Sequence, residues 1–336
     1  MTRALRRAWS YEKLPAPGVP NAMQSDGTLW GFLERDVLRS TNGWATAQTV
    51  TTLPVDMYRI AAIHLLDDDD TLIISHGNVR FGSSLFRYVI STDTLTGPVL
   101  EFPVGYAVNW NLDSHGDLVF ASEYGNRLND DNPRRIYKST DAGETFALAC
   151  VLDEGSGSHI HRVLYDPHTN VLWASQGDGA FAKLFRIDGP DHDTPVQVRA
   201  TQPTAGVLNA DYILWGEDGG PRGVSRYTKA TEVFDFPLDL GVVGGGAFAD
   251  YVFSMRMDAN ERAYASTAGS ASGHSKIGVF YADPPYESWH LLAWHDEPVG
   301  IFHLAAVSDD VIWWGTNRRG YAYRRTPVGA ARSLRT

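Results

Sequence analysis

The feature that most constrains this chain is a unit of sequence that recurs along its whole length. Each copy is a turn signal rich in Asp, Asn or Gly, followed by a short apolar run with β-branched or aromatic residues. The copies lie at residues 26–30, 69–73, 116–120, 169–173, 211–215, 260–264 and 309–313. From Leu29 to Ile312 their mean spacing is about 47 residues, which is the length of a repeat built from a few short elements. The chain is therefore predicted to stack similar units side by side.

Four short strands can be placed around most of these signals. The second unit is predicted to have strands at 57–65, 71–75, 84–90 and 98–103, the third at 106–112, 118–123, 134–139 and 146–152, and the fourth at 159–165, 171–175, 182–187 and 195–200. The fifth and sixth units are expected within 206–236 and 251–294. Short β-branched and aromatic runs between Gly, Asp, Asn and Pro are typical of all-β proteins, and no segment keeps a 3.6-residue period. We predict a β-propeller with four-stranded blades.

The two ends of the chain complement each other. The seventh unit has only three predicted strands, at 300–306, 310–315 and 319–325, and the segment 8–14 precedes the first unit without a blade of its own. That segment is expected to supply the fourth strand of the last blade and leave no open sheet edge. The prediction is a single seven-bladed domain over 1–326 with a tail at 327–336. Six blades is the alternative, because the first and fifth units are the least regular.

One turn has a distinctive sequence, Ser139-Thr140-Asp141-Ala142-Gly143-Glu144-Thr145-Phe146. The side chains of Ser139 and Asp141 can accept backbone N–H groups, Gly143 permits positive φ, and Phe146 begins the returning strand. The pattern resembles the Asp-box, or BNR repeat, of sialidase-like β-propellers, with a degenerate copy at 40–44 and a remnant at 91–93. In that family the box joins the third and fourth strands of a blade, so the resemblance implies a structural role.

Charge and cysteine content exclude several classes of function. The formal net charge of −11 argues against nucleic acid and anionic membranes as partners, and no apolar run is long enough for a membrane span. Cys150 is the single cysteine, which rules out an intrachain disulfide and favours a buried, unreactive thiol. The basic N-terminus lacks the apolar core of a signal peptide. We therefore expect synthesis in the cytoplasm, with association with a virion as one destination.

Polar residues gather in loops that join the second and third strands of each blade. In a propeller these loops share one face with the loops between blades and surround the mouth of the central channel. We expect ligand-binding residues there, namely His76, Asn78, Asn126, Glu217, Asp218 and Asn317, with Trp110 as an aromatic surface. A structural alternative stays open, because Gly followed by Asn or Asp also suits the positive φ of a turn.

Two histidines open the fourth unit. Their spacing places the imidazoles of His159 and His161 on one side of a strand. With a nearby carboxylate, either Asp178 or Glu123, they could bind a divalent metal or transfer protons, and Tyr124 could act as an acid. The alternative is a hydrogen-bonded pair inside the channel. No cofactor is expected beyond this divalent metal. The stretch from His159 through Asp178 also resembles a segment of bacterial and phage Asp-box propellers of unassigned activity.

A second resemblance concerns the segment Tyr58-Arg59-Ile60-Ala61. It is similar to the Tyr/Phe-Arg-Ile-Pro motif of sialidases, whose arginine grips the carboxylate of sialic acid, and this implies a ligand-binding role for Arg59. Ala61 stands where the motif has proline, and no complete arginine triad or Tyr–Glu pair can be found. The sequence therefore argues against sialidase activity.

The sequence supports three functions. The first is recognition of a glycan or polysaccharide, with the protein acting as a phage tail or receptor-binding component that contacts a cell surface and other virion proteins. The alternative is a carbohydrate-active enzyme, either a glycoside hydrolase with two opposed carboxylates or a polysaccharide lyase with a histidine base. The third is a structural scaffold.

Overall fold

The structure is a computed structural model. It describes residues 9–15, 18–54, 60–78, 80, 82–107, 111–125, 134–152, 159–218, 222–240, 251–268, 277–295, 302–307, 312–316 and 321–327. Within these residues the regular elements are β-strands, apart from one short 3-10 helix, η2 (Gly179–Phe181). No helix among them has the length and apolar character needed to cross a membrane.

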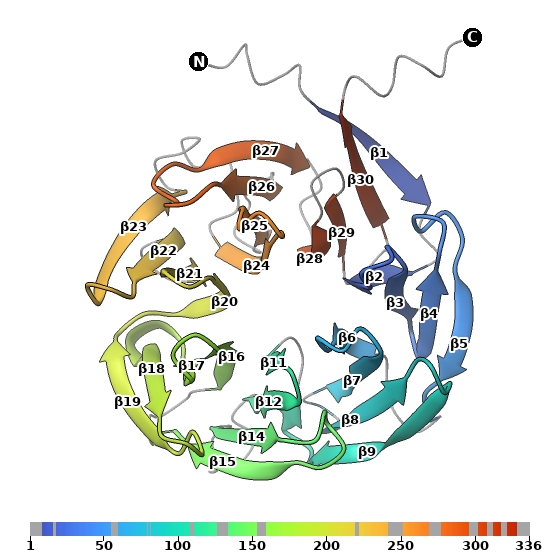
Figure 1. Cartoon of the computed structure of the whole chain (residues 1–336), viewed down its shortest axis with the longest axis horizontal. Helices are drawn as coiled ribbons and strands as arrows, with labels where there is room; N and C mark the ends of the chain where they lie inside the picture. The colour runs from blue at the N-terminus through green and yellow to red at the C-terminus, as the bar shows by residue number, and fades with distance from the viewer. Residues whose placement is uncertain are drawn as a thin grey trace.

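The strands form antiparallel four-stranded sheets arranged as the blades of a propeller around a central axis (Figure 1). Six sheets consist of four strands in sequence order. Blade 1 contains β2 (Val19–Met23), β3 (Leu29–Leu33), β4 (Asp36–Ser40) and β5 (Gln48–Thr52), and blade 2 contains β6 (Ile60–Leu65), β7 (Thr71–Asn78), β8 (Gly82–Val89) and β9 (Thr94–Phe102). Blade 3 contains β11 (Leu112–His115), β12 (Leu118–Ser122), β14 (Arg135–Ser139) and β15 (Ala147–Val151).

The next three blades repeat this plan. Blade 4 contains β16 (Ile160–Asp166), β17 (Val171–Gln176), β18 (Lys183–Asp188) and β19 (Thr194–Arg199). Blade 5 contains β20 (Pro203–Leu208), β21 (Tyr212–Glu217), β22 (Gly223–Thr228) and β23 (Val233–Asp239). Blade 6 contains β24 (Tyr251–Met257), β25 (Ala263–Ala268), β26 (Ile277–Ala282) and β27 (His290–His295).

A seventh four-stranded sheet joins the two ends of the chain. It contains β28 (Phe302–Val307), β29 (Ile312–Thr316), β30 (Tyr321–Pro327) and, on its outer side, β1 (Trp9–Pro15). Residues Trp9 to Pro15 pair antiparallel with Pro327 to Tyr321, and Figure 1 shows the two strands β1 and β30 side by side. This is the pairing expected for segment 8–14. In the described residues, six four-stranded sheets are each built from a single stretch of the chain, which is the number of blades in the alternative prediction, and the sheet that joins the two ends is a seventh.

The start of blade 3 differs from the sequence-based prediction. The expected inner strand at 106–112 is wrong, because the inner strand β11 begins at Leu112. Residues Tyr106–Ala107 instead form β10, which pairs with β13 (Tyr124–Gly125) in a separate two-stranded ladder. Pairing with the loop that joins the second and third strands of blade 3 (the B–C loop) diverts this segment from the blade and holds Tyr124 at the start of that loop.

The hydrophobic core is divided into layers, each packed between two neighbouring blades. Trp30 of blade 1 and Phe86 of blade 2 belong to one such layer and are each 1% exposed. Between blades 4 and 5 the rings of Trp173 and Trp215 lie 6.2 Å apart, edge to face. Both faces of a blade are therefore buried against neighbours, at about 1.5–3 kcal/mol for each large apolar side chain removed from water.

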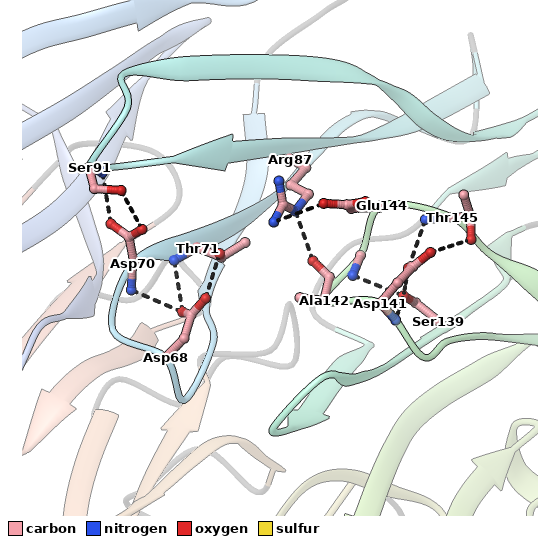
Figure 2. A network of polar contacts seen from close by, with 11 residues as sticks. Asp68, Asp70, Thr71, Arg87, Ser91, Ser139, Asp141, Ala142, Glu144 and Thr145 are labelled. Carbon is pink, nitrogen blue, oxygen red and sulfur yellow. Dashed lines mark hydrogen bonds and ion pairs between the residues drawn. The ribbon is translucent and has the colours of Figure 1, made fainter.

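The turn with the Asp-box-like sequence is held by its own polar side chains (Figure 2). Ser139 Oγ accepts the N–H of Gly143 at 2.9 Å, and Asp141 accepts both the N–H and the hydroxyl of Thr145, at 2.9 and 2.6 Å. Gly143 has φ of +80°, and a Cβ atom there would lie 2.4 Å from Ile73 Cδ1 of blade 2. Glycine is thus favoured by the positive φ, and a larger residue would also have to displace the end of the Ile73 side chain.

The same turn is tied to blade 2 by an arginine, which Figure 2 shows reaching across from β8. Arg87 Nε donates to the carbonyl oxygen of Ala142 at 3.0 Å, and its Nη2 lies 3.6 Å from Glu144 Oε1. The turn therefore connects the third and fourth strands of blade 3 and also fixes the position of two blades relative to each other.

Candidate functional site

The candidate site begins at the entry to blade 4, where β16 leaves the loop that comes from blade 3. His159 precedes this strand, and the pairing with β17 shifts between Ile160 and Arg162, so that His161 occupies a bulge. A bulge inserts one extra residue and redirects its side chain. The imidazole rings of His159 and His161 lie 4.4 Å apart between centroids, and both residues are buried.

A carboxylate and an aromatic ring complete the cluster. Asp178 follows β17, in the B–C loop of the same blade, and its Oδ1 lies 3.1 Å from His161 Nε2 while its Oδ2 lies 3.8 Å from His159 Nε2. The Tyr124 ring of blade 3 lies 4.2 Å from the His159 ring. The structure thus brings together four residues predicted from the sequence as site residues.

Blade 5 contributes two further side chains. Gln202, which precedes β20, donates through Nε2 to Asp178 Oδ1 at 2.8 Å and to Asp218 Oδ2 at 3.3 Å. Its Oε1 accepts the N–H of Gly179 at 3.0 Å. Asp218 was predicted as a ligand-binding residue, whereas Gln202 was missed. The sequence feature that could have identified Gln202 as a site residue is its position just before the first strand of its blade, which is also the position of His159.

The ionisable groups of the cluster have pKa values that are shifted in different directions. Burial lowers the pKa of His159 to about 4, with His161 adding to this effect and Asp178 opposing it. The hydrogen bond with His161 lowers the pKa of Asp178, while burial raises the pKa of Asp218 to about 6. Burial and then the charges of Asp178 and Asp218 raise the pKa of Tyr124 to about 12. At neutral pH the site therefore combines a neutral imidazole, an ionised carboxylate and a protonated phenol.

The cluster also has the donor set of a divalent metal site. His159, His161 and Asp178 each offer one ligand atom, and these atoms lie within 4.8 Å of one another. Two imidazoles and one carboxylate are ligands that suit Zn²⁺ and similar ions, and a site with three protein ligands leaves a position open for a ligand from solution. The predicted metal at His159 and His161 therefore has a third candidate ligand, Asp178.

Glu123 is not part of this constellation, although it was predicted as a catalytic carboxylate. It is 2% exposed, and its Oε2 accepts the backbone N–H groups of Arg134 and Arg135, both at 3.0 Å. Its Oε1 lies 3.2 Å from Arg135 Nη1 and accepts the Tyr137 hydroxyl at 3.3 Å. The carboxylate is thus enclosed by donors of its own blade, which gives it a structural role.

Two predicted ligand-binding residues are enclosed in the same way. Glu217 is 1% exposed and accepts the hydroxyl groups of Thr201 and Ser225, and burial raises its pKa. His76 is fully buried, with its ring centroid 6.3 Å from that of Phe86. All three residues lie near the end of the second strand of a blade. Each of these side chains is almost completely removed from solvent in this structure.

The other predicted site residues cannot be placed. Arg59, Trp110, Asn126 and Asn317 lie outside the described residues. Asn78 is described only through its backbone, which pairs with Gly82 at the end of β7. Their proposed ligand-binding roles stay predictions.

Comparison with known proteins identifies the fold. No protein-family model matches the chain, and no curated protein matches it. Solved structures do match: the extracellular domain of a one component system from B. thetaiotaomicron has a TM-score of 0.64 and 13% identity, over 95% of this chain and 40% of that chain. A chain of the Mitotic Checkpoint Complex has a TM-score of 0.67 and 12% identity, over 94% of this chain and 93% of that chain.

A third match is the GH74 xyloglucanase from Xanthomonas campestris, with a TM-score of 0.65 and 14% identity. The alignment covers 93% of this chain and 53% of the xyloglucanase, so this chain spans about half the length of that enzyme. At such low identities the similarity concerns the fold and not the activity. The comparisons and the sheet topology together show that the chain is an all-β propeller built from four-stranded blades.

Proposed function

We propose that this chain is a carbohydrate-recognising β-propeller that binds its glycan at the cluster of Tyr124, His159, His161, Asp178 and Asp218. The observation that supports this proposal most strongly is the meeting of an aromatic ring, two imidazoles and two carboxylates from three neighbouring blades. Residues from separate blades do not need to meet for the fold to form. Their convergence where loops end favours a binding role.

The chemistry of the cluster fits a sugar. An aromatic ring offers an apolar face to the C–H groups of a pyranose, while carboxylates and amides exchange hydrogen bonds with its hydroxyl groups. The Asp178 side chain is 55% exposed and can be reached by a ligand, whereas the imidazoles beneath it are 10% and 4% exposed. Asp178 is therefore the outer contact, and the buried histidines hold it in position or share a divalent cation with it.

Glycoside hydrolysis is a second candidate, favoured by the relation between Asp178 and Asp218. Both carboxylates accept from the same Gln202 nitrogen, so their bonded oxygens are at most about 6 Å apart, an upper limit that includes the separation of about 5–5.5 Å in retaining glycosidases. Their pKa values are displaced in opposite directions. A carboxyl group with a raised pKa beside a carboxylate with a lowered pKa is the arrangement that such hydrolysis uses.

The test is a glycan and polysaccharide screen that measures binding and product release on the same samples, with and without a chelator. We expect Asp178→Asn to weaken binding at least tenfold, while Glu232→Gln, a change on an exposed turn of blade 5, leaves it unchanged. If the wild type releases a hydrolysis product and Asp218→Asn does not, the protein is a glycoside hydrolase and not only a binding protein. A product with a new carbon–carbon double bond would indicate a lyase instead. Binding that is equal in wild type and Asp178→Asn would contradict the proposed site.

Two finer assignments belong to this proposal. We assign the turn from Ser139 to Phe146 to the Asp-box type, supported by the hydrogen bonds that its Ser and Asp side chains make within the turn. A place for the protein in a phage tail or on a virion surface stays a prediction of the sequence.

A further inference from the structure

A second polar site lies at the centre of the ring, where every blade contributes to the lining of one cavity. The described residues around it come from the innermost strands β2, β6, β11, β16, β20, β24 and β28. The cavity offers about 60 Å³ to the centre of a water molecule. That is several times the space of about 10–15 Å³ that one water needs, and well below the roughly 300–1,000 Å³ of pockets for drug-sized ligands.

Two arginines line this cavity. Arg162 of β16 donates through Nη1 to the Leu112 carbonyl oxygen at 3.2 Å, and its Nη2 lies 3.6 Å from Asp113 Oδ1. Arg256 of β24 donates through Nε to the Leu304 carbonyl oxygen at 3.1 Å. Among the described residues, no carboxylate forms an ion pair with Arg256, and none of the cavity-lining residues is acidic.

Among the described residues, the charges at the centre do not balance. Asp113 is the carboxylate beside the two guanidinium groups, and its Oδ2 already accepts the N–H of Tyr165 at 2.6 Å. His64 lines the same cavity, with its Nε2 2.7 Å from Ser114 Oγ, and burial followed by the charges of Arg256 and Arg162 lowers its pKa to about 3. It is therefore neutral at pH 7. Two positive groups of the described residues thus face one negative group, and like charges held close together in a small cavity repel each other.

We propose that this cavity binds one small oxyanion, between Arg162 and Arg256. The ligand class is a compact anion with several acceptor oxygens, either a tetrahedral ion such as inorganic phosphate or the carboxylate of a small acid. The planar fork of a guanidinium group matches such oxygens in two parallel hydrogen bonds. Ser254 adds a hydroxyl donor, because its Oγ accepts the N–H of Leu304 and leaves its own hydrogen to donate.

The structure also provides an approach to this site. A larger recess of about 400 Å³ shares Ile63, His64 and Arg256 with the cavity and extends to Asp67 and Asp69, in the turn after β6. Both acids have partners, since Asp67 pairs with His115 and Asp69 accepts from Ser25. This turn lies at the opposite end of the inner strands from the loops that carry Asp178. The anion site is therefore separate from the proposed glycan site, and each can fail without the other.

The first measurement is the unfolding temperature of the wild-type protein in inorganic phosphate and in sodium chloride of equal ionic strength. Phosphate at a hundredfold excess over its dissociation constant should raise the unfolding temperature by about 4 °C, and calorimetry should show one site per chain. Sulfate and acetate in parallel samples distinguish a tetrahedral ion from a carboxylate. Unfolding temperatures in phosphate, sulfate and acetate that all equal the value in chloride, with no calorimetric binding of any of the three ions, would overturn the proposal.

Variants locate the site. Arg256→Gln should weaken phosphate binding at least tenfold, whereas Arg262→Gln should leave it unchanged, because Arg262 pairs with the exposed Asp283 in the same blade. If Arg256→Gln does not fold, Arg256→Lys keeps the charge but loses the fork and should weaken binding several-fold. Phosphate binding that is equal in wild type and either folded Arg256 variant would show that the ion binds elsewhere.

Discussion

Replacement of Glu123 distinguishes a structural carboxylate from a catalytic one. In the structure this side chain receives two backbone N–H groups, one guanidinium group and one phenol, and it is 2% exposed. Its removal in Glu123→Ala would leave the N–H groups of Arg134 and Arg135 without an acceptor beneath the B–C loop. We therefore expect a loss of stability and no direct effect on a ligand at the rim.

The magnitude follows from these contacts. A hydrogen bond to a charged group contributes about 1.5–3 kcal/mol, so losing the two backbone N–H bonds costs about 3–6 kcal/mol, whereas the Arg135 side chain is 32% exposed and can turn to solvent. We expect Glu123→Ala to lower the free energy of unfolding by about 3–5 kcal/mol. Unfolding entropy near 2.1 cal/mol/K per residue gives about 0.7 kcal/mol/K for 336 residues, so the unfolding temperature should fall by about 4–7 °C.

Glu123→Gln provides a graded comparison. The amide oxygen can still accept the two backbone N–H groups, but the amide nitrogen then meets the guanidinium group of Arg135, and two donors face each other. The expected loss is about 1.5–3 kcal/mol, between wild type and Glu123→Ala. Glu232→Ala is the surface control, since its side chain is 72% exposed and should change stability by less than about 0.5 kcal/mol.

The assay is urea unfolding followed by tryptophan fluorescence, together with glycan binding at a temperature where every variant is folded. Glu123→Ala should be less stable yet bind as wild type does, whereas Asp178→Asn should be stable and bind poorly. The reasoning would be refuted by a Glu123→Ala protein that keeps wild-type stability but loses binding or product release.

Three further predictions concern stability and reactivity. Gly143→Ala should lower unfolding stability more than Gly27→Ala in the same urea assay: both residues have positive φ, at a cost of about 1–2 kcal/mol for alanine, but only at Gly143 would the added Cβ meet Ile73. Equal losses of unfolding free energy in the two variants would show that the Ile73 side chain of blade 2 moves aside at no measurable cost. His64 has a pKa near 6.5 in the unfolded chain and about 3 in the folded chain, so between these values only the unfolded chain binds a proton there. As the pH falls below 6.5, the free energy of unfolding of the wild type should therefore decrease more steeply than that of His64→Asn, by up to about 1.4 kcal/mol per pH unit. Parallel urea titrations at pH 7 and pH 4.5 check this slope, and identical slopes would contradict it. Burial raises the pKa of Cys150 to about 12, so a thiol reagent should label it only after unfolding, and rapid labelling of the native protein would disprove its burial.

Local sequence signals predict most strands because the forces that define them are local. In blade 4 the predicted strands at 159–165 and 171–175 lie within one residue of β16 and β17. Turn residues and β-branched runs specify where each strand begins and ends, whatever the rest of the chain does. The strand predicted at 106–112 was wrong because the structure of this segment depends on a distant partner. That partner, β13, belongs to a loop that no local sequence pattern identifies.

The candidate site was only partly predictable. The spacing of His159 and His161 indicated a pair, and Asp178 was recognised as a nearby carboxylate. Glu123 and Asp178 look alike in sequence, because each is a carboxylate that comes just after the second strand of its blade. Alternation along a strand predicts which face of the sheet a side chain occupies, but in a propeller both faces of a blade pack against other blades. A polar residue on either face can therefore be enclosed, as Glu123 is, or exposed at the rim, as Asp178 is.

The sequence by itself determined an all-β repeat, the placing of most strands, the pairing partner of the N-terminal segment and the sequence of the Ser139–Phe146 turn, because these depend on short-range propensity and periodicity. Only the tertiary structure decided which side chains meet. Gln202 joins Asp178 to Asp218, and Arg162 and Arg256 face one cavity although 94 positions separate them in sequence. Closing the ring sets these distances, and no local pattern encodes how far a strand residue lies from the common axis.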